Sequence, residues 1–383
     1  MTDALALAQA LIRKPSVTPV DAGAQDVLAE ALETTGFTVW RFVEGEAPDG
    51  PVHNLFARRG DRGPHFAFAG HTDVVPPGPD SAWDGDPFAA ELKDGWLMGR
   101  GASDMKSAIA AFVAAADRVQ PEGGSISLII TGDEEGPATY GTKVLIDWMQ
   151  AEGHVPDHCL VGEPTSQKTL GDMVKIGRRG SVNVWVTVTG AQGHVAYPHQ
   201  AENPIPILIE VLACLQARVL DDGNDWFQPS NLEVTDLHVG NPAHNVIPAV
   251  AEARLNIRFN DQHRGADLVA WIEETAAAVC ERAVVNAKIS GEAFLTAPGD
   301  FSSLIADAIE SETGMAPKLS TGGGTSDARF IRSLCPVVEF GLVGKTMHKV
   351  DEAVRADDVE TLAATYAKIL KGYFDASFQP RNR

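Results

Sequence analysis

An apolar run that ends in three consecutive carboxylates is the feature that most constrains the fold of this chain. The run covers residues 126–130, and Asp133, Glu134 and Glu135 follow it before a Gly-Pro pair breaks the pattern. This order predicts a buried strand that ends in an acidic turn. Adjacent carboxylates repel each other, so such a turn needs a nearby cation or a bound proton unless it is fully solvated. Taken alone, the turn fits either a solvated loop or a cation site.

A second predicted strand, residues 65–70, is followed by His71 and Asp73. Side chains two residues apart in an extended segment point to the same face, so these two lie together. A metal-ligating imidazole usually donates its second N–H to a carboxylate or a carbonyl. The pair therefore suits a ligand and the residue that orients it, although a single histidine is more often part of a core or a surface.

Two further acids occupy comparable places. Glu163 follows a predicted strand at residues 158–161, and Asp104 ends a glycine-rich loop that leads into a predicted helix at residues 108–119. A helix cap would also explain Asp104. In open α/β sheets the functional site lies outside the carboxyl ends of the strands. We therefore expect one rim to gather His71, Asp104, Glu134, Glu135 and Glu163.

Such a rim has the composition of a divalent-metal site. Carboxylates and imidazoles without thiolates suit zinc, with cobalt or manganese as substitutes. His348, in the polar loop 347–352, could supply a second imidazole.

The pattern changes from residue 180 onward. Alternating residues at 182–189 predict a half-buried strand, and the elements that follow complete the order β-α-β-β-α-β of a ferredoxin-like unit. We therefore predict an α/β domain formed by residues 1–179 and 295–383, with a domain of residues 180–294 inserted into it. The later helices are predicted at residues 204–219, 266–282, 301–313, 326–333 and 356–374.

Composition excludes several kinds of partner. The net charge of -21 disfavours nucleic acid and anionic membrane surfaces, which carry the same sign. The start of the chain has no basic segment before its apolar residues, and no apolar run approaches the ~20 residues of a membrane span. The four cysteines are far apart and suggest small core residues in a reducing compartment. We expect a cytoplasmic protein.

The inserted domain and its junctions carry further polar candidates. Arginines can grip carboxylates with two parallel hydrogen bonds, and Arg178 lies at the junction while Arg258 lies on a predicted strand. His194, Tyr197 and Asn245 lie in predicted loops. Each of these residues also fits an ordinary loop or surface position.

A glycine-rich segment, residues 321–327, precedes the predicted helix 326–333 and contains Gly324 and Thr325. Backbone N–H groups at such a place can cradle an anion. The segment lacks the Lys-Ser/Thr ending of a phosphate-binding loop. It fits a carboxylate cradle or a plain turn.

Five segments resemble the zinc-dependent aminoacylase and carboxypeptidase family of co-catalytic metallohydrolases. They are GHTDVVP at 70–76, GRGASDMK at 99–106, TGDEEG at 131–136, VGEPT at 161–165 and MHKVDE at 347–352. Three more resemble the members that remove a succinyl group from diaminopimelate: GRRGS at 177–181, QGHVAYPH at 192–199 and GGTSDARF at 323–330. Ser107 and His244 depart from the common pattern, and the second could alter substrate contacts.

The resemblance implies a mixed-sheet catalytic domain with helices on both faces and an inserted dimerisation domain. It also implies two zinc ions, with cobalt as a substitute, bridged by Asp104. His71 and Glu163 would complete one site, and Glu135 and His348 the other.

The same resemblance assigns the remaining roles. Asp73 would orient His71, Glu134 would be the general base, and His194 would reach the site from the partner subunit of a homodimer. The small-molecule substrate, an N-succinyl amino acid, would be held by Arg178, Tyr197, Asn245, Arg258, Gly324 and Thr325.

Three other functions remain open from the sequence. The chain could be another amide hydrolase of this family, such as an acetylornithine deacetylase or a carboxypeptidase. It could be a binding module that keeps the fold without the chemistry, or a phosphate-handling enzyme built on the segment 321–327.

Overall fold

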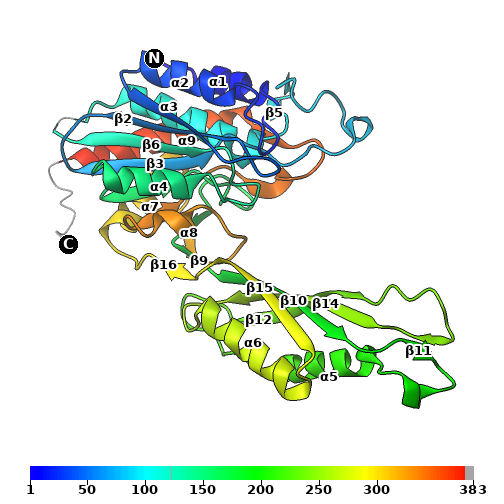
Figure 1. The fold of residues 1–383 in the computed structure, drawn as a ribbon. Helices are drawn as coiled ribbons and strands as arrows, with labels where there is room; N and C mark the ends of the chain where they lie inside the picture. Colours follow the sequence, from blue (N-terminus) through cyan, green and yellow to red (C-terminus); the bar gives the residue numbers. More distant parts are fainter. Residues whose placement is uncertain (122, 376–383) are drawn as a thin grey trace. The chain divides into compact units, whose positions relative to one another are not determined.

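The computed structural model describes residues 1–121 and 123–375, which form two compact units (Figure 1). Unit 1 comprises Met1–Ile176, Thr296–Ser320 and Ser326–Arg383, and unit 2 comprises Gly177–Leu295 and Thr321–Thr325. The junctions lie three residues before and one residue after the predicted boundaries, and residues 321–325 group with unit 2. Residues 376–383 of the predicted first domain lie outside the described residues.

Unit 1 is built on a mixed sheet. Among the described residues, eight strands form it in the order β1 (Thr38–Glu44), β2 (Val52–Arg59), β6 (Ser125–Thr131), β3 (His65–His71), β7 (His158–Val161), β18 (Val337–Glu339), β8 (Met173–Lys175) and β17 (Lys318–Ser320). The central strands β6, β3, β7 and β18 run parallel, whereas β1, β2 and β8 introduce antiparallel pairs. This sheet confirms the predicted α/β class.

Helices cover both faces of this sheet. They are α1 (Ala4–Ile12), α2 (Ala24–Thr34), α3 (Ser107–Arg118), α4 (Thr142–Ala151), α7 (Asp300–Thr313), α8 (Ala328–Ile331) and α9 (Ala356–Phe374). On one face, Phe68 of β3 stacks on Phe112 of α3 and meets Tyr366 of α9 edge to face. On the other face, Phe56 of β2 contacts Trp148 of α4. Burial of these large rings from two sides fixes the sheet between its helices.

A small second sheet in unit 1 joins distant parts of the chain. Its strands are β4 (Leu92–Lys93), β5 (Trp96–Met98) and β19 (Ala353–Arg355). The pairing of β5 with β19 holds the loop before α3 against the loop before α9.

Unit 2 has the predicted order β-α-β-β-α-β. The elements are β10 (Gly180–Thr189), α5 (Pro204–Gln216), β12 (Asn231–His238), β14 (Val250–Phe259), α6 (Gly265–Val279) and β15 (Ala283–Gly291). The strands form an antiparallel sheet in the order β12-β14-β10-β15. Two short pairs, β9 (Gly177–Arg178) with β16 (Phe294–Leu295) and β11 (Gly193–His194) with β13 (Val246–Ile247), complete the unit.

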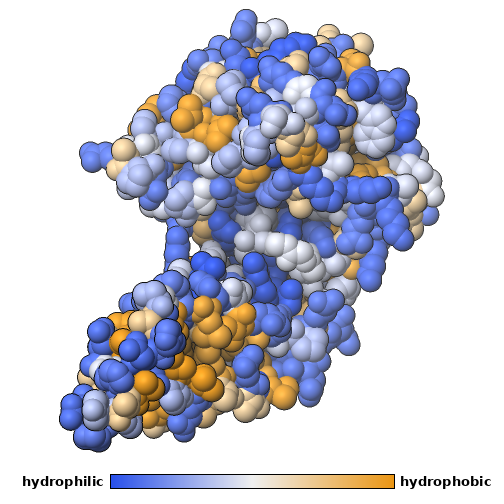
Figure 2. Space-filling model, turned by 90° about the vertical axis from the view of Figure 1, so that its right-hand side faces the viewer, coloured by the Kyte–Doolittle hydropathy of each residue, from blue (hydrophilic) through white to orange (hydrophobic). Residues whose placement is uncertain are grey.

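Unit 2 exposes large apolar side chains. Figure 2 shows hydrophobic residues, in orange, gathered on part of the visible surface of this unit. Exposed apolar side chains of unit 2 include Val195, Tyr197, Ile209, Leu237 and Val284.

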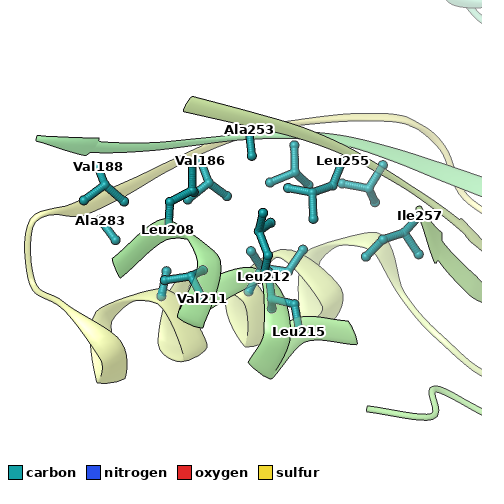
Figure 3. Close-up of a cluster of buried hydrophobic side chains, with 14 of the residues drawn as sticks. Val186, Val188, Leu208, Val211, Leu212, Leu215, Ala253, Leu255, Ile257 and Ala283 are labelled. Carbon is teal, nitrogen blue, oxygen red and sulfur yellow. The ribbon is translucent and has the colours of Figure 1, made fainter. Parts of the chain in front are cut away.

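The core of unit 2 lies between one face of its sheet and its two helices (Figure 3). Val186 and Val188 of β10 and Leu255 of β14 face Leu208 and Leu212 of α5. Buried and more exposed side chains alternate along β10, which is therefore a strand with one buried face, as the sequence predicted.

Several expectations about local structure were wrong. The helix predicted at residues 326–333 is only the four-residue α8, and the three-residue strands β8 and β17 were missed because so short a run has no periodicity. Cys159 and Cys335 are buried as predicted, but Cys214 is exposed. It lies outside the buried stripe of α5, whose core positions are Leu208, Val211, Leu212 and Leu215.

No helix among residues 1–121 and 123–375 combines the length and the apolar character needed to cross a bilayer.

His65, at the start of β3, is buried as a neutral imidazole. Its Nε2 lies 2.8 Å from Ser127 Oγ, and its Nδ1 lies 3.3 Å from the carbonyl oxygen of Val155. Burial and then the positive charge of Arg58 lower the pKa of His65 from 6.5 to about 4. Below pH 6.5, His65 therefore stays neutral in the folded chain while the same histidine binds a proton in the unfolded chain.

We expect His65 to make folding pH-dependent. Its stabilising effect is complete above pH 6.5 and is lost as the pH falls toward 4, because only the unfolded state binds the proton in that window. Relative to His65→Gln, the wild-type free energy of unfolding should drop by about 2 kcal/mol between pH 7 and pH 5. Urea unfolding of both proteins measures this difference. A difference that does not change with pH would contradict the assignment.

Candidate metal centre

Three neighbouring parallel strands place acids and a histidine at one edge of the unit 1 sheet. β3 lies between β6 and β7, and His71 is its last residue. Glu134 and Glu135 follow β6, and Glu163 follows β7. The carboxyl ends of parallel strands meet at the same edge, as expected for a site in this class of fold.

Asp104 lies between two imidazoles. Its Oδ1 is 3.1 Å from His71 Nε2, and its Oδ2 is 3.2 Å from His348 Nε2. His71 Nε2 also lies 3.9 Å from Glu163 Oε1, and His348 Nε2 lies 2.8 Å from Glu135 Oε1. The two oxygens of one carboxylate thus face two sets of ligand atoms, one with Glu163 and the other with Glu135.

The loop before α3 gives Asp104 this position. Gly101 has φ +86°, a backbone conformation that suits glycine, and η2 (Ala102–Lys106) follows it directly. Asp104 is 5% exposed, and its neighbours in η2 are buried as well. The turn therefore points a carboxylate into the protein instead of only capping the following helix.

Asp73 holds the acidic turn. Its carboxylate accepts hydrogen bonds from the backbone N–H of Glu134 (3.2 Å) and of Glu135 (3.0 Å). The ring Nδ1 of His71 is closer to the Asp73 carbonyl oxygen (2.9 Å) than to its carboxylate (3.6 Å). The backbone of Asp73 thus directs the imidazole, while its side chain fixes the two glutamates.

Ligand-type atoms converge in two overlapping groups. His71, Asp104 and Glu135 form one, and His71, Glu134 and Glu163 form the other, with the atoms of each group within 4.8 Å of one another. His71 is 1% exposed, whereas the His348 side chain is 44% exposed. The centre therefore has a buried inner wall and an outer wall open to solvent.

Burial and mutual repulsion dominate the electrostatics of the centre. Burial, and then the charge of Glu163, raise the pKa of Glu134 well above its ordinary value. Burial would lower the pKa of His71, but its hydrogen bond to Asp104 and the surrounding carboxylates raise it well above 6.5. The hydrogen bonds that His348 donates to the carboxylates of Asp104 and Glu135 raise its pKa to about 10. Burial is thus the first cause for Glu134, whereas the surrounding carboxylates raise the pKa of both imidazoles.

This donor set fits divalent metal ions. Carboxylate oxygens and imidazole nitrogens are zinc ligands, and a carboxylate with oxygens facing two ligand groups suits a pair of ions. The Nε2 of His71 faces the Asp104 carboxylate and its Nδ1 lies 2.9 Å from the Asp73 carbonyl oxygen. This arrangement matches a ligating imidazole whose second nitrogen donates to a carbonyl.

The predicted substrate-binding residues lie in unit 2. Arg178 is buried, and its Nη1 donates to the carbonyl oxygen of Gly324 at 2.9 Å, so the structure brings these two together. Burial and then the charge of Arg179 lower the pKa of Arg258. Thr325 lies next to Gly324 in the short stretch of the chain that joins unit 2.

The other predicted residues of unit 2, His194, Tyr197 and Asn245, are exposed. His194 lies in β11 with its ring centroid 5.7 Å from that of Tyr197. Asn245 is also exposed, and its carbonyl oxygen accepts a hydrogen bond from the backbone N–H of Val195. His194 and Asn245 therefore belong to neighbouring segments.

Sequence reasoning gave no role to Glu352 or Arg100. They form a fully buried ion pair, with Arg100 Nη1 2.6 Å from Glu352 Oε2. Both lie within segments that carry the resemblance, which was the one signal that could have singled them out.

Residues 67–372 match the family described as Peptidase family M20/M25/M40, and the chain belongs to this family. Relatives called succinyl-diaminopimelate desuccinylase match almost end to end. The protein from Rhizorhabdus wittichii is 65% identical over 97% of this chain and 98% of its own length. Those from Caulobacter vibrioides (60%, covering 98% and 97%) and Zymomonas mobilis (56%, covering 97% and 98%) are similar.

Solved structures share the fold at low identity. An M20 family metallo-carboxypeptidase from Sulfolobus solfataricus superposes with a TM-score of 0.77 at 16% identity, covering 98% of this chain and 100% of its own. A dinuclear metal binding peptidase of the M20 family from Bacillus subtilis gives 0.69 at 15% identity, covering 96% of each chain.

We expect Asp73→Ala to release the acidic turn. Loss of both acceptors should speed amide exchange in a peptide covering residues 132–137 by about 10-fold to 100-fold. Hydrogen exchange followed by mass spectrometry measures this rate. Asp73→Asn, which keeps one acceptor, should show a smaller increase, and a peptide from β12 should not change. Wild-type exchange in the Asp73→Ala turn would contradict the role.

Proposed function

We propose that this chain hydrolyses the amide bond of N-succinyl-LL-2,6-diaminopimelate, giving succinate and LL-2,6-diaminopimelate for lysine and peptidoglycan precursor synthesis. The observation that carries this proposal is the near end-to-end match to relatives of that name at 56–65% identity. The convergence of two imidazoles and several carboxylates at one sheet edge supports the chemistry.

The proposed cofactor is a pair of zinc ions, for which cobalt can substitute. Asp104 would bridge them, with His71 and Glu163 on one side and Glu135 and His348 on the other, in agreement with the distances around Asp104. The ions would polarise the amide carbonyl and make a water molecule acidic enough to lose a proton near neutral pH.

Glu134 is the proposed general base. Its carboxylate takes the proton from the attacking water and then delivers it to the amine nitrogen as the C–N bond breaks. Its backbone N–H is held by Asp73, as is that of its neighbour Glu135. The carboxylate of Asp73 therefore positions both Glu134, the proposed base, and Glu135, a proposed metal ligand.

The protein is proposed to act as a cytoplasmic homodimer through unit 2. The exposed apolar side chains of unit 2 support an interface on this unit. His194 of the partner subunit would donate a hydrogen bond to the carbonyl oxygen, which becomes an oxyanion when water attacks the carbonyl carbon.

The grip on the substrate is assigned to residues suited to carboxylates. Arg178 and Arg258 carry guanidinium groups, which bind a carboxylate through two hydrogen bonds. Tyr197, Asn245, Gly324 and Thr325 are proposed to complete the recognition of the succinyl and diaminopimelate ends.

A substrate panel tests the activity. With added zinc, the chain should turn over N-succinyl-diaminopimelate with kcat/KM at least about 100-fold above that for N-acetylornithine or a dipeptide, because carboxylate contacts made by only one substrate discriminate strongly. Glu134→Ala should lower kcat by about 1,000-fold while keeping both metal ions, measured by metal analysis. Faster turnover of acetylornithine would identify a different deacylase, and no turnover of any amide would favour a binding module.

Mixed dimers test whether the site is shared. Glu134→Ala and His194→Ala dimers should each be inactive. A heterodimer purified with two different tags should recover about half of the wild-type activity, since one of its two sites then has both groups. The two parent dimers, mixed without subunit exchange, are the control. Inactive heterodimers would show that His194 does not act across the interface.

A further inference from the structure

We propose that the buried ion pair of Arg100 and Glu352 is a positioning device that fixes Asp104 and His348 relative to each other. The two residues belong to segments far apart in the sequence, and each segment carries one ligand of the candidate centre. The inference rests on the metal-ligand roles in the proposed function and adds residues that hold those ligands.

The pair continues a connection made by the backbone. β5 pairs with β19, with Met98 opposite Ala353, and the N–H of Gly99 donates to the carbonyl oxygen of Glu352 at 2.8 Å. Arg100 and Glu352 therefore lie just beyond the last paired residues of the two segments. Their side chains extend the link from the small sheet toward the metal centre.

The carboxylate of Glu352 holds the segment that carries Asp104. Its Oε1 accepts hydrogen bonds from the backbone N–H of Ser103 (2.8 Å) and of Asp104 (3.1 Å). Its Oε2 accepts from Arg100 Nη1 at 2.6 Å. The Glu352 side chain is 0% exposed, so each of these bonds is protected from competing water.

The guanidinium of Arg100 holds the segment that carries His348. Besides its bond to Glu352, Nη1 donates to the carbonyl oxygen of Lys349, the residue after His348, at 3.1 Å. The ring of Trp83 lies 5.3 Å from the guanidinium carbon and covers it. One buried cation thus fixes the backbone next to the second imidazole.

The loop with His348 has an unfavourable backbone conformation that contacts with the rest of the protein must stabilise. His348 has φ +63° and Asp351 has φ +55°, values that residues other than glycine adopt only at a cost in free energy. Such conformations persist only when contacts with the surrounding structure hold them in place. The Lys349 carbonyl bonded to Arg100 lies between these two residues.

The energetics favour a positional role for the pair. A buried ion pair adds little net stability, because desolvation offsets the attraction, but loss of one partner leaves a buried charge uncompensated. Groups that orient metal ligands typically change metal affinity or activity 10-fold to 100-fold when replaced. Glu352 and Arg100 form hydrogen bonds with the backbone of the segments that carry the ligands. We therefore expect their replacement to shift Asp104 and His348 and to change the affinity for metal.

Zinc titration of the metal-free protein tests the inference. Glu352→Gln keeps an acceptor for the two backbone N–H groups but sets an amide against Arg100. The retained acceptor still holds the backbone of Asp104, whereas the disturbed Arg100 loosens the segment with His348. The ion on the Glu135 and His348 side should therefore bind about 10-fold to 100-fold more weakly, and the other ion should change much less. With cobalt, the absorption bands of the weakened site should change, and kcat should fall while KM stays within about threefold. Chelator competition, absorption and steady-state kinetics give the three readings.

Two further variants separate positioning from a general loss of stability. Asp221→Asn replaces a buried, multiply hydrogen-bonded carboxylate of unit 2, so it should lower the melting temperature without changing zinc affinity. Arg100 Nη1 makes both bonds, to Glu352 and to the Lys349 carbonyl oxygen. Arg100→Lys keeps the positive charge on a side chain one bond shorter, so its ammonium falls short of the position of Nη1, and it should weaken the ion on the Glu135 and His348 side by at least about 10-fold. If Glu352→Gln does not fold, Arg100→Lys decides the question.

The outcomes distinguish this inference from the proposed function. If the wild type binds two zinc ions and the folded variants bind both with wild-type affinity, the positioning role is wrong and the metal assignment stands. Equal weakening of both ions, with unchanged cobalt bands, would likewise reject positioning in favour of a general structural effect. If the wild type itself binds fewer than two ions, the failure lies in the proposed function.

Discussion

Repulsion among carboxylates at the carboxyl edge of β6, β3 and β7 is the constraint on which the rest of unit 1 depends. Buried acids that face one another need positive charge, and the chain supplies two imidazoles beside Asp104. The hydrogen bond to Asp104 and the surrounding carboxylates raise the pKa of His71 despite its burial, and burial followed by the charge of Glu163 raises the pKa of Glu134. The sheet, the loop before α3 and the loop before α9 together hold these groups where a pair of dications would neutralise them.

Much of the centre could be predicted from the sequence because its residues follow strands directly. His71 ends β3, the Glu134-Glu135 pair follows β6 and Glu163 follows β7, so a local pattern and a rule for parallel sheets suffice. The β-α-β-β-α-β order of unit 2 was equally accessible, since its long strands alternate over one buried face.

The features that the sequence did not predict depend on tertiary contacts. No local pattern says that the Asp73 carbonyl, and not its carboxylate, lies nearer to His71, because this depends on the backbone of one turn. The ion pair of Arg100 and Glu352 joins residues of two loops that are far apart in the sequence, so the sequence around either residue does not indicate its partner. The exposed Cys214 and the short β8 and β17 were missed because a single residue or a three-residue run carries too little pattern.

The interrupted layout of unit 1 sets an order for the assembly of its centre. The ribosome releases the chain from its N-terminus, so His71, Asp104 and Glu163 emerge before Gly177–Leu295 is made, and His348 emerges after it. A nascent chain can therefore hold an incomplete cluster of acids while unit 2 folds. The second ligand group can close only after His348 has emerged, so loading of the proposed pair of metal ions has to wait until the parts of unit 1 on both sides of unit 2 have been made.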